Sequence, residues 1–260
     1  YRKPVRDVPP TDSRPAAGIE RMLWYGCSTR VRYRNRVEQL HDGGEAFAAL
    51  ISALQGARRY IHLSYYIFAD DRIGHAIADI LVRKARAGVE VRLLYDAIGS
   101  WKLSERFVRR LRGAGIEVRA YAPLRFPWFS PRANRRNHSK IAVIDGHIGF
   151  TGGVNLADEY INRKVRFGHW KDNAIRLKGE AVKNFTVMFL QMWDVCSKKL
   201  DSDFDYSPYL DTGDYFHSPE LDMDGFSIPF SDSPIDGEPV GHQLYLDIIY
   251  QAKKYVYIMT

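Results

Sequence analysis

Apolar and polar positions along residues 36–195 alternate between two periods, one typical of strands and one typical of helices. The predicted strands are rich in aromatic and β-branched residues and cover residues 37–40, 60–68, 89–95, 116–121 and 172–177. The predicted helices cover residues 44–56, 73–88 and 103–111. A further helix is predicted to bury a core-forming face made of Val182, Phe185, Phe189, Met192 and Trp193. This alternation predicts a layered α/β domain.

Residues 137–155 read NHSKIAVIDGHIGFTGGVN and predict a β-hairpin. Two apolar strands flank an Asp-Gly pair at 145–146, which tolerates the positive φ angles of a type I′ turn. With the turn centred on that pair, His138 is expected to lie opposite Gly153.

The hairpin brings together residue types that suit a phosphodiester. Side chains alternate along a strand, so His138 and Lys140 are expected on the same face. Gly153 is expected to leave space above the imidazole for a phosphate, and Asn155 lies at the same end of the hairpin. Lys140 and Asn155 would hold the nonbridging oxygens while the imidazole attacks phosphorus or relays protons. Lys140, Gly153 and Asn155 are therefore the candidate phosphate-binding residues.

Two carboxylates complete the candidate catalytic set of His138, Lys140, Asp145 and Asp172. Asp145 lies seven strand residues from His138, or roughly 23 Å, which is too far to orient that ring. It is therefore interpreted as a turn residue or a structural hydrogen-bond acceptor within the motif. Asp172 precedes a predicted neighbouring strand and is the better candidate to hold the imidazole.

The charge of the chain is unevenly distributed. Residues 1–200 carry 36 Lys plus Arg against 19 Asp plus Glu, a net charge of +17, whereas residues 201–240 carry nine Asp, two Glu and no basic residue. The basic body is expected to attract a polyanion, either nucleic acid or an anionic lipid surface. Cys27 and Cys196 are too few and too far apart for a disulfide framework or metal-ligand spacing, so no metal or cofactor is predicted.

Four regions are predicted along the chain. Residues 1–35 form an N-terminal extension, residues 36–200 the first α/β domain, and residues 201–240 an acidic linker or a loop that shapes the site entrance. Residues 241–260 are expected to begin a second copy of the domain. The evidence is an internal repeat at an offset of 195 residues, in which ARRYI (57–61) aligns with AKKYV (252–256).

The motif H-x-K-x4-D-x6-G-G-x-N, from His138 to Asn155, resembles the signature of the phospholipase D superfamily. The flanking sequences resemble bacterial cardiolipin synthases in residues 40–68, 136–146, 152–160 and 169–182. The resemblance covers most of residues 36–195. It implies a layered α/β/α fold with a mixed central sheet, duplicated so that two motifs face each other across one metal-free site.

The resemblance also implies roles for individual residues. One motif histidine becomes a transient phosphohistidine and the other acts as acid and base, so His138 is a candidate for either role. Lys140 and Asn155 are implied to bind phosphate, and Asp172 to steady the histidine. For cardiolipin synthases it implies transfer of a phosphatidyl group between two phosphatidylglycerol molecules, with release of glycerol, at the cytoplasmic face of the inner membrane.

This sequence departs from the family pattern in having one complete motif. The other H-x-K, at 169–171, has Arg176 where the motif needs Asp, and no Gly-Gly follows it. The second half of the site is therefore expected from the same longer chain or from a dimer partner. No apolar stretch approaches the roughly 20 residues that span a bilayer.

A loop rich in aromatic and basic residues precedes the motif. Aromatic side chains insert at headgroup level and Arg attracts anionic lipid, so this loop is a candidate membrane contact through Arg125, Phe126, Trp128 and Phe129. The alternative is an ordinary loop whose aromatic residues fold back onto the core.

Three functions remain open at this point. The leading hypothesis is a phosphatidyltransferase of the cardiolipin synthase type. The second is a phosphodiesterase or nuclease of the same superfamily that acts as a dimer, although nucleic acid is the less expected partner. The third is a non-catalytic lipid-binding module.

Overall fold

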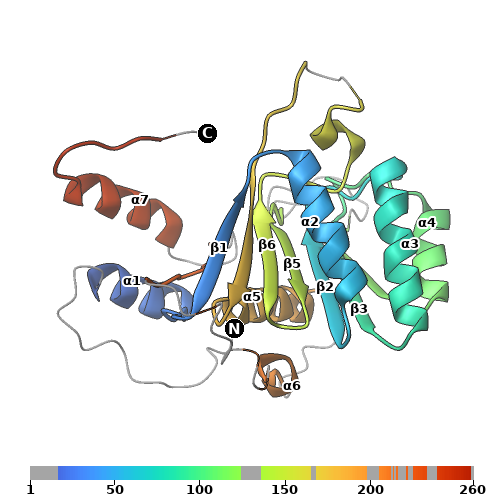
Figure 1. Ribbon diagram of the computed structural model, residues 1–260, viewed down its shortest axis with the longest axis horizontal. Helices are drawn as coiled ribbons and strands as arrows, with labels where there is room; N and C mark the ends of the chain where they lie inside the picture. The colour runs from blue at the N-terminus through green and yellow to red at the C-terminus, as the bar shows by residue number, and fades with distance from the viewer. Residues whose placement is uncertain are drawn as a thin grey trace.

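The computed structural model describes residues 17–123, 136–164, 168–197, 205–211, 213, 215, 221, 225–232 and 239–258. A seven-stranded mixed sheet forms its centre, in the order β1-β7-β6-β5-β2-β3-β4 (Figure 1). Its strands are β1 (Asn35–Leu40), β2 (Tyr60–Tyr65), β3 (Glu90–Asp96), β4 (Glu117–Tyr121), β5 (Lys140–Ile144), β6 (Ile148–Gly152) and β7 (Ala174–Gly179). Strands β2, β3 and β4 are parallel, and all other neighbours are antiparallel.

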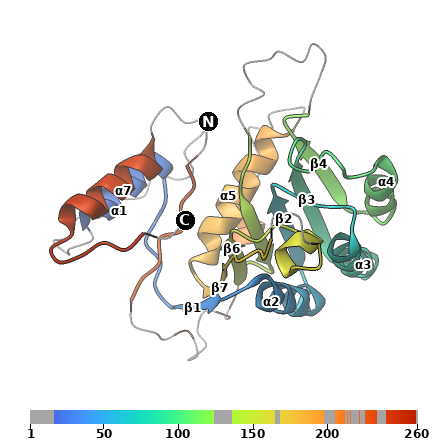
Figure 2. The same cartoon turned by 90° about the horizontal axis from the view of Figure 1, so that it is seen from above.

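Helices cover both faces of the sheet, which confirms the predicted layered α/β/α fold with a mixed sheet (Figure 2). One face carries α2 (Gly43–Gly56), α3 (Arg72–Arg86) and α4 (Glu105–Gly113), and the other carries α5 (Val182–Val195). Helices α2, α3 and α4 begin where a side chain accepts a backbone N–H three residues later, from Asp42, Asp71 and Ser104 respectively.

The core lies on both sides of β2, whose six residues are all buried. Helices α2 to α4 pack on one face of the sheet, and α5 packs on the other through Val182, Phe185, Phe189 and Trp193, which are buried as predicted. Met192 is only partly buried. A strand buried on both faces is held rigidly, and its C-terminal end is therefore a firm base for functional side chains.

The predicted β5–β6 hairpin forms, but its register differs by one residue from the prediction. Asp145 and Gly146 both have positive φ, as an Asp-Gly turn requires. His147 joins them in the loop, however, so that Ile144 pairs with Ile148 and Ile141 with Thr151. The expected pairing of His138 with Gly153 is therefore wrong, because the turn contains three residues instead of two.

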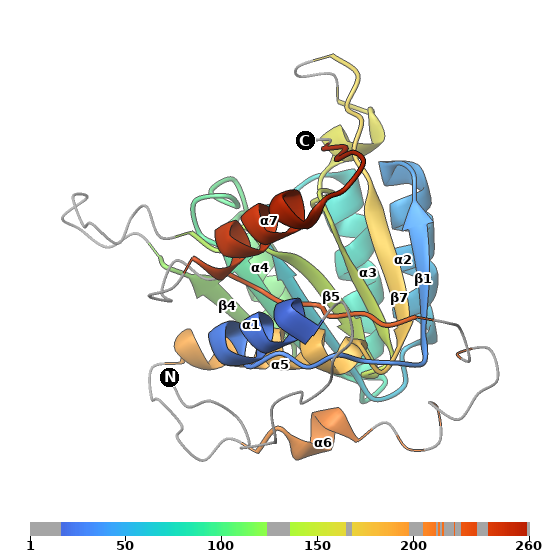
Figure 3. The same ribbon diagram turned by 90° about the vertical axis from the view of Figure 1, so that its left-hand side faces the viewer.

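The N-terminal extension contains a helix that periodicity did not reveal. Helix α1 (Ala17–Cys27) packs beside α7 (Val240–Gln251) (Figure 3). A Cβ atom at Gly26 would lie 2.6 Å from a methyl group of Val240, so glycine permits this close approach.

The described parts of the acidic segment pack against the first domain. Helix α6 (Ser207–Leu210) and the following turn receive hydrogen bonds from the Arg59 guanidinium, which donates to the carbonyl oxygens of Pro208 and Asp211. Residue Ser227 pairs with Arg32. These contacts lie near the start of β2 and before β1, at the end of the sheet away from His138. The described residues therefore do not shape the entrance to the predicted site.

The repeat predicted at the end of the chain has a structural counterpart in its helix. The aligned residues Ala57 and Ala252 directly follow helices α2 and α7. Each donates its backbone N–H over 3.3 Å to the carbonyl oxygen three residues earlier. Their ψ angles are also alike, 138° and 130°. Residues 252–258 do not form the expected strand, because no neighbouring strand pairs with them in the described part of the chain. The second copy of the domain therefore stays a prediction.

Candidate active site

The candidate residues gather at one edge of the sheet, which we call the His138 edge. It is formed by the last residues of β2 and β3 and by the first residues of β5 and β7, with the 3-10 helix η2 (Asp158–Ile161) beside them. Carboxyl ends of parallel strands are common binding sites in α/β folds. The antiparallel strand β5 brings its amino end to this edge, so His138 enters the site from just before β5.

His138 and Lys140 lie together, with their side chains on the same side of the chain. The Nζ atom of Lys140 is 3.1 Å from each ring nitrogen of His138 and donates a hydrogen bond of 2.8 Å to its carbonyl oxygen. The imidazole also lies against the Tyr66 ring, with 4.7 Å between centroids. His138 is exposed, whereas Lys140 is only 6% exposed. The accessible imidazole of His138 thus lies beside the largely buried ammonium group of Lys140.

The environment keeps the imidazole neutral. Partial burial lowers the pKa of His138 from its ordinary value, the Lys140 charge lowers it further, and Asp96 opposes both effects. Burial also lowers the pKa of Lys140 to about 8, although the Asp172 carboxylate acts to raise it. At neutral pH the pair therefore offers an unprotonated ring nitrogen beside a mostly protonated amine, which suits attack on an anionic phosphorus centre.

Asn155 is held by structural hydrogen bonds. Its side-chain Oδ1 atom accepts the backbone N–H of Ile67, and its side-chain Nδ2 atom donates to the Tyr160 hydroxyl over 2.5 Å. The residue is 2% exposed. The structure places Asn155 next to the His138 edge, where it joins the end of β2 to η2, and its phosphate-binding role stays a prediction.

The space beside Gly153 is filled by Asp172. A Cβ atom at position 153 would lie 1.9 Å from the Asp172 Oδ1 atom. The expected clearance for a phosphate above His138 is thus wrong, since glycine at this position makes room for a carboxylate of the chain itself.

Asp172 lies just before β7, the neighbouring strand, and its charge acts on Lys140. Its Oδ1 atom accepts the backbone N–H of Asn173, and its Oδ2 atom is 3.5 Å from the indole nitrogen of Trp170. Its charge raises the pKa of Lys140, whereas the carboxylate that acts on His138 is Asp96. Asp172 thus acts electrostatically on the lysine, and its hold on the imidazole stays a prediction.

Asp145 lies at the far end of β5 and accepts three backbone hydrogen bonds. They come from the amides of Arg58, Arg59 and Tyr60, at 2.8, 2.7 and 2.9 Å. These contacts make it a structural hydrogen-bond acceptor that fixes the start of β2 against the hairpin turn.

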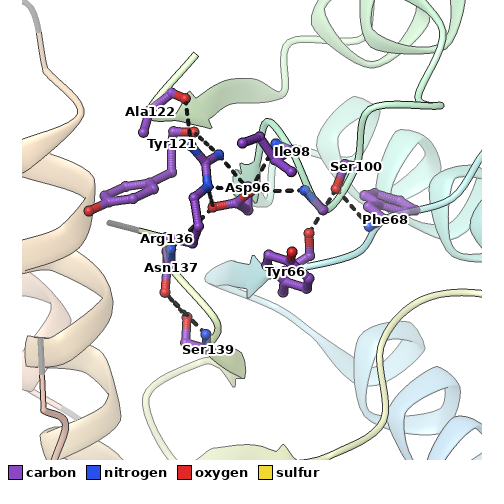
Figure 4. Close-up of polar contacts among 11 residues, drawn as sticks. Tyr66, Phe68, Asp96, Ile98, Ser100, Tyr121, Ala122, Arg136, Asn137 and Ser139 are labelled. Carbon is purple, nitrogen blue, oxygen red and sulfur yellow. Dashed lines mark hydrogen bonds and ion pairs between the residues drawn. The ribbon is translucent and has the colours of Figure 1, made fainter. Parts of the chain in front are cut away.

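Sequence reasoning missed Asp96, which ends β3 and bonds to the residues immediately before His138 (Figure 4). The available signal was an acidic residue at the carboxyl end of a predicted parallel strand. Tyr66 was missed as well, although it follows a strand that reaches the same edge.

A family model described as cardiolipin synthase, phospholipase D-like domain, matches residues 50–193, which is more than half of the chain. The chain belongs to this family. A cardiolipin synthase of Alkalihalophilus pseudofirmus is 38% identical over 238 residues, which are 88% of this chain and 44% of that protein. A cardiolipin synthase of Geobacillus kaustophilus is 39% identical over 224 residues, which are 85% of this chain and 43% of that protein. The chain thus spans less than half of the length of these relatives.

The fold of this phospholipase D-like domain is also found among solved structures. A phosphatidylserine synthase of Haemophilus influenzae superposes with a TM-score of 0.54 over 84% of this chain and 54% of that chain. Sequence identity is 16%, so this likeness concerns the fold alone.

Some predictions about the domain fall outside the described residues. The candidate membrane contacts Arg125, Phe126, Trp128 and Phe129 lie in residues 124–135, which the structure does not describe. Within the described residues, no helix combines the length and the apolar character needed to cross a bilayer. The same residues contain no group of three or more His, Cys, Asp or Glu placed to hold a metal ion.

Proposed function

We propose that the chain supplies one half of the active site of a phosphatidyltransferase of the cardiolipin synthase type. The observation that carries the proposal is the pair of His138 and Lys140, whose Nζ atom lies 3.1 Å from both ring nitrogens. An exposed neutral imidazole and a fixed cation at one sheet edge suit a negatively charged phosphodiester. A second motif, from the same longer chain or a dimer partner, supplies the other half.

The proposed reaction has two displacements at phosphorus. A ring nitrogen of His138 attacks the phosphodiester of one phosphatidylglycerol, so that a P–N bond forms as the P–O bond to glycerol breaks. The glycerol oxygen takes its proton from an acid of the second motif. The hydroxyl group of another phosphatidylglycerol then returns a proton to that acid and attacks phosphorus, which breaks the P–N bond and releases cardiolipin.

Lys140 stabilises the charge that develops on the nonbridging oxygens in each displacement. Its ammonium already lies beside the attacking ring, so little reorganisation is needed when the phosphoryl group arrives. Asp172 supports the protonated state of this lysine. Asn155 is proposed to offer its amide to the same phosphate.

The charge distribution supports an anionic lipid surface as the partner. The net charge of +17 over residues 1–200 attracts headgroups of phosphatidylglycerol. We place the protein at the cytoplasmic face of the inner membrane on this basis and on its likeness to cardiolipin synthases.

The proposal is tested in the complete protein that carries this chain, with vesicles of phosphatidylglycerol as substrate. Wild-type protein should form cardiolipin and glycerol in equal amounts, and His138→Ala should abolish both products. His147→Ala is the matched control, because His147 lies in the turn of the same hairpin at the opposite end, and it should retain turnover. Cardiolipin formation by His138→Ala at the wild-type rate would refute the assignment.

The single complete motif in the chain and the basic body favour one other candidate, a nuclease that completes its site by dimerisation. In that case a DNA substrate should be cleaved by a dimer, and vesicles of phosphatidylglycerol should yield no cardiolipin. A histidine that never carries labelled phosphate with either substrate would favour a non-catalytic lipid-binding module.

A further inference from the structure

Asp96 is a fully buried carboxylate at the end of β3, and its exposed fraction is 0%. Its Oδ1 atom accepts the backbone N–H groups of Ile98 and Gly99, each at 2.9 Å. Its two oxygens also accept from the Nε and Nη2 atoms of Arg136, with the shortest contact at 2.6 Å. A buried carboxylate with this many donors has one defined position.

Arg136 extends this contact to the neighbouring strand. Its Nη1 and Nη2 atoms donate to the carbonyl oxygens of Ala122 and Tyr121, at 3.1 and 3.4 Å. Ala122 has a φ of 43°, in the left-handed region that non-glycine residues rarely adopt. The guanidinium therefore spans the ends of β3 and β4 and fixes the chain two residues before His138.

Asn137 fixes the chain one residue before His138. Its backbone N–H donates to Asp96 over 3.1 Å, and its side-chain amide donates to the Ser64 hydroxyl of β2. Its side-chain Oδ1 atom accepts from the backbone N–H and the hydroxyl of Ser139, the residue after His138. Both neighbours of His138 are thus tied to one buried network (Figure 4).

The loop after Asp96 also fixes the backbone of Tyr66, the residue whose ring packs against the imidazole. The backbone N–H of Ser100 bonds to the carbonyl oxygen of Asp96, and the Ser100 hydroxyl donates to the carbonyl oxygen of Tyr66. A Cβ atom at Gly99 would lie 2.2 Å from that same carbonyl oxygen. The backbone before His138 and the backbone of Tyr66, whose ring lies beside the imidazole, are therefore both tied to Asp96 and the loop after it.

We propose that the buried Asp96–Arg136 ion pair is the positioning element of His138, which aims its imidazole at the phosphorus atom of the substrate. This inference rests on the proposed function, because it assumes that His138 is the reacting group. A misplacement of the ring by about 1 Å would lower kcat by as much as ~100-fold. The KM for the lipid should change little, since neither residue of the pair binds the headgroup.

The charges around His138 give the inference a readout that does not depend on turnover. The groups that act on the imidazole are Lys140 from β5 and Asp96 from β3, with the phenol ring of Tyr66 packed against it from the end of β2. Asp172 acts on Lys140 from two residues before β7. Because Asp96 alone among the described groups that act on His138 raises the pKa of that imidazole, neutralising Asp96 should lower it.

The experiment is a titration of His138 by NMR in the full 260-residue chain, with the ring signal assigned by its loss in His138→Ala. Asp96→Asn should lower the pKa of His138. The matched control is Asp145→Asn, because Asp145 is likewise a buried carboxylate with three backbone donors, at the other end of β5. The control should lower thermal stability and leave the pKa of His138 unchanged.

A second variant tests the geometry if Asp96→Asn fails to fold. Arg136→Lys keeps the positive charge beside Asp96 but lacks the planar fork, so it cannot span the carbonyl oxygens of β4 as well. The nuclear Overhauser contact between the rings of His138 and Tyr66 should weaken. In the complete protein, kcat should fall with an unchanged KM.

The proposal is overturned if Arg136→Lys preserves the ring contact and kcat, or if Asp96→Asn folds and leaves the pKa of His138 as in wild type. Either result would reduce the pair to a stabilising element of the fold. Failure of the proposed function looks different, because it appears as turnover retained in His138→Ala.

Discussion

The carboxylate of Asp172 occupies the volume that a side chain at position 153 would need, with its Oδ1 atom 1.9 Å from an ideal Cβ. Glycine at this place in the motif therefore serves a contact within the protein. It lets Asp172, two residues before β7, lie against the chain just after β6, and the charge of Asp172 raises the pKa of Lys140.

Gly153→Ala should displace Asp172 and destabilise the domain by about 1–3 kcal/mol, as overpacking commonly does. Chemical denaturation measures the loss. Gly56→Ala is the control, because a Cβ atom at Gly56 meets nothing within 4 Å, and this variant should be neutral or slightly stabilising. Adding Asp172→Ala to Gly153→Ala should recover part of the loss, and strictly additive losses would contradict the proposed clash.

Lys140 should make stability depend on alkaline pH. Its pKa falls from 10.5 in the unfolded chain to about 8 in the folded protein, so between these values the unfolded chain binds more protons and stability rises with pH. The cost of burying the charged amine is fully present below pH 8. Relative to Lys140→Met, the wild-type protein should therefore gain thermal stability as the pH is raised from 7 to 10. A difference in Tm that stays constant over this range would contradict the lowered pKa.

The same substitution should change the titration of His138. Burial has the largest effect on the pKa of the imidazole and lowers it, and the charge of Lys140 lowers it further. Lys140→Met should therefore raise this pKa. NMR titration of the histidine ring measures this shift. Lys102→Met is a suitable control, because Lys102 lies over the Trp101 ring in a separate loop and should leave His138 unaffected.

Asp145→Ala should destabilise the domain, because three backbone N–H groups at the start of β2 would lose their acceptor. Each buried donor left without a partner costs about 1–3 kcal/mol, reduced where water enters. Denaturant unfolding should show a lower midpoint. Hydrogen exchange should rise at the amides of Arg59 and Tyr60, and exchange unchanged at these positions would exclude the anchoring role.

The sequence allowed good prediction of what local pattern determines. The strands and helices of residues 36–195 followed from periodicity, whereas helix α1 did not, and the Asp-Gly pair correctly predicted a turn with two positive φ angles. The register did not follow, because the Asp-Gly pair does not fix whether the turn contains two or three residues, and His147 joins it. The grouping of His138 with Lys140 came from strand alternation alone.

The rest of the site depends on contacts between residues far apart in the chain. Asp96 meets Arg136 across 40 residues, and nothing in the local pattern of either segment indicates the partner. Asp172 was assigned to His138 by its expected place at the start of a neighbouring strand. Its closeness to Gly153 and its effect on Lys140 depend on the pairing of β6 with β7, which only the folded sheet determines.

Helix α6 has a consequence for how the molecule meets a charged surface. The Arg59 guanidinium and the Tyr60 hydroxyl both donate to its backbone, and so they tether residues 208–211 at the end of β2 opposite His138. Asp211 is thereby held at the end of the sheet opposite His138, away from Lys140. Under the proposed function, the basic body of the chain would be drawn to an anionic lipid surface by long-range electrostatic attraction, with Asp211 on the side away from His138.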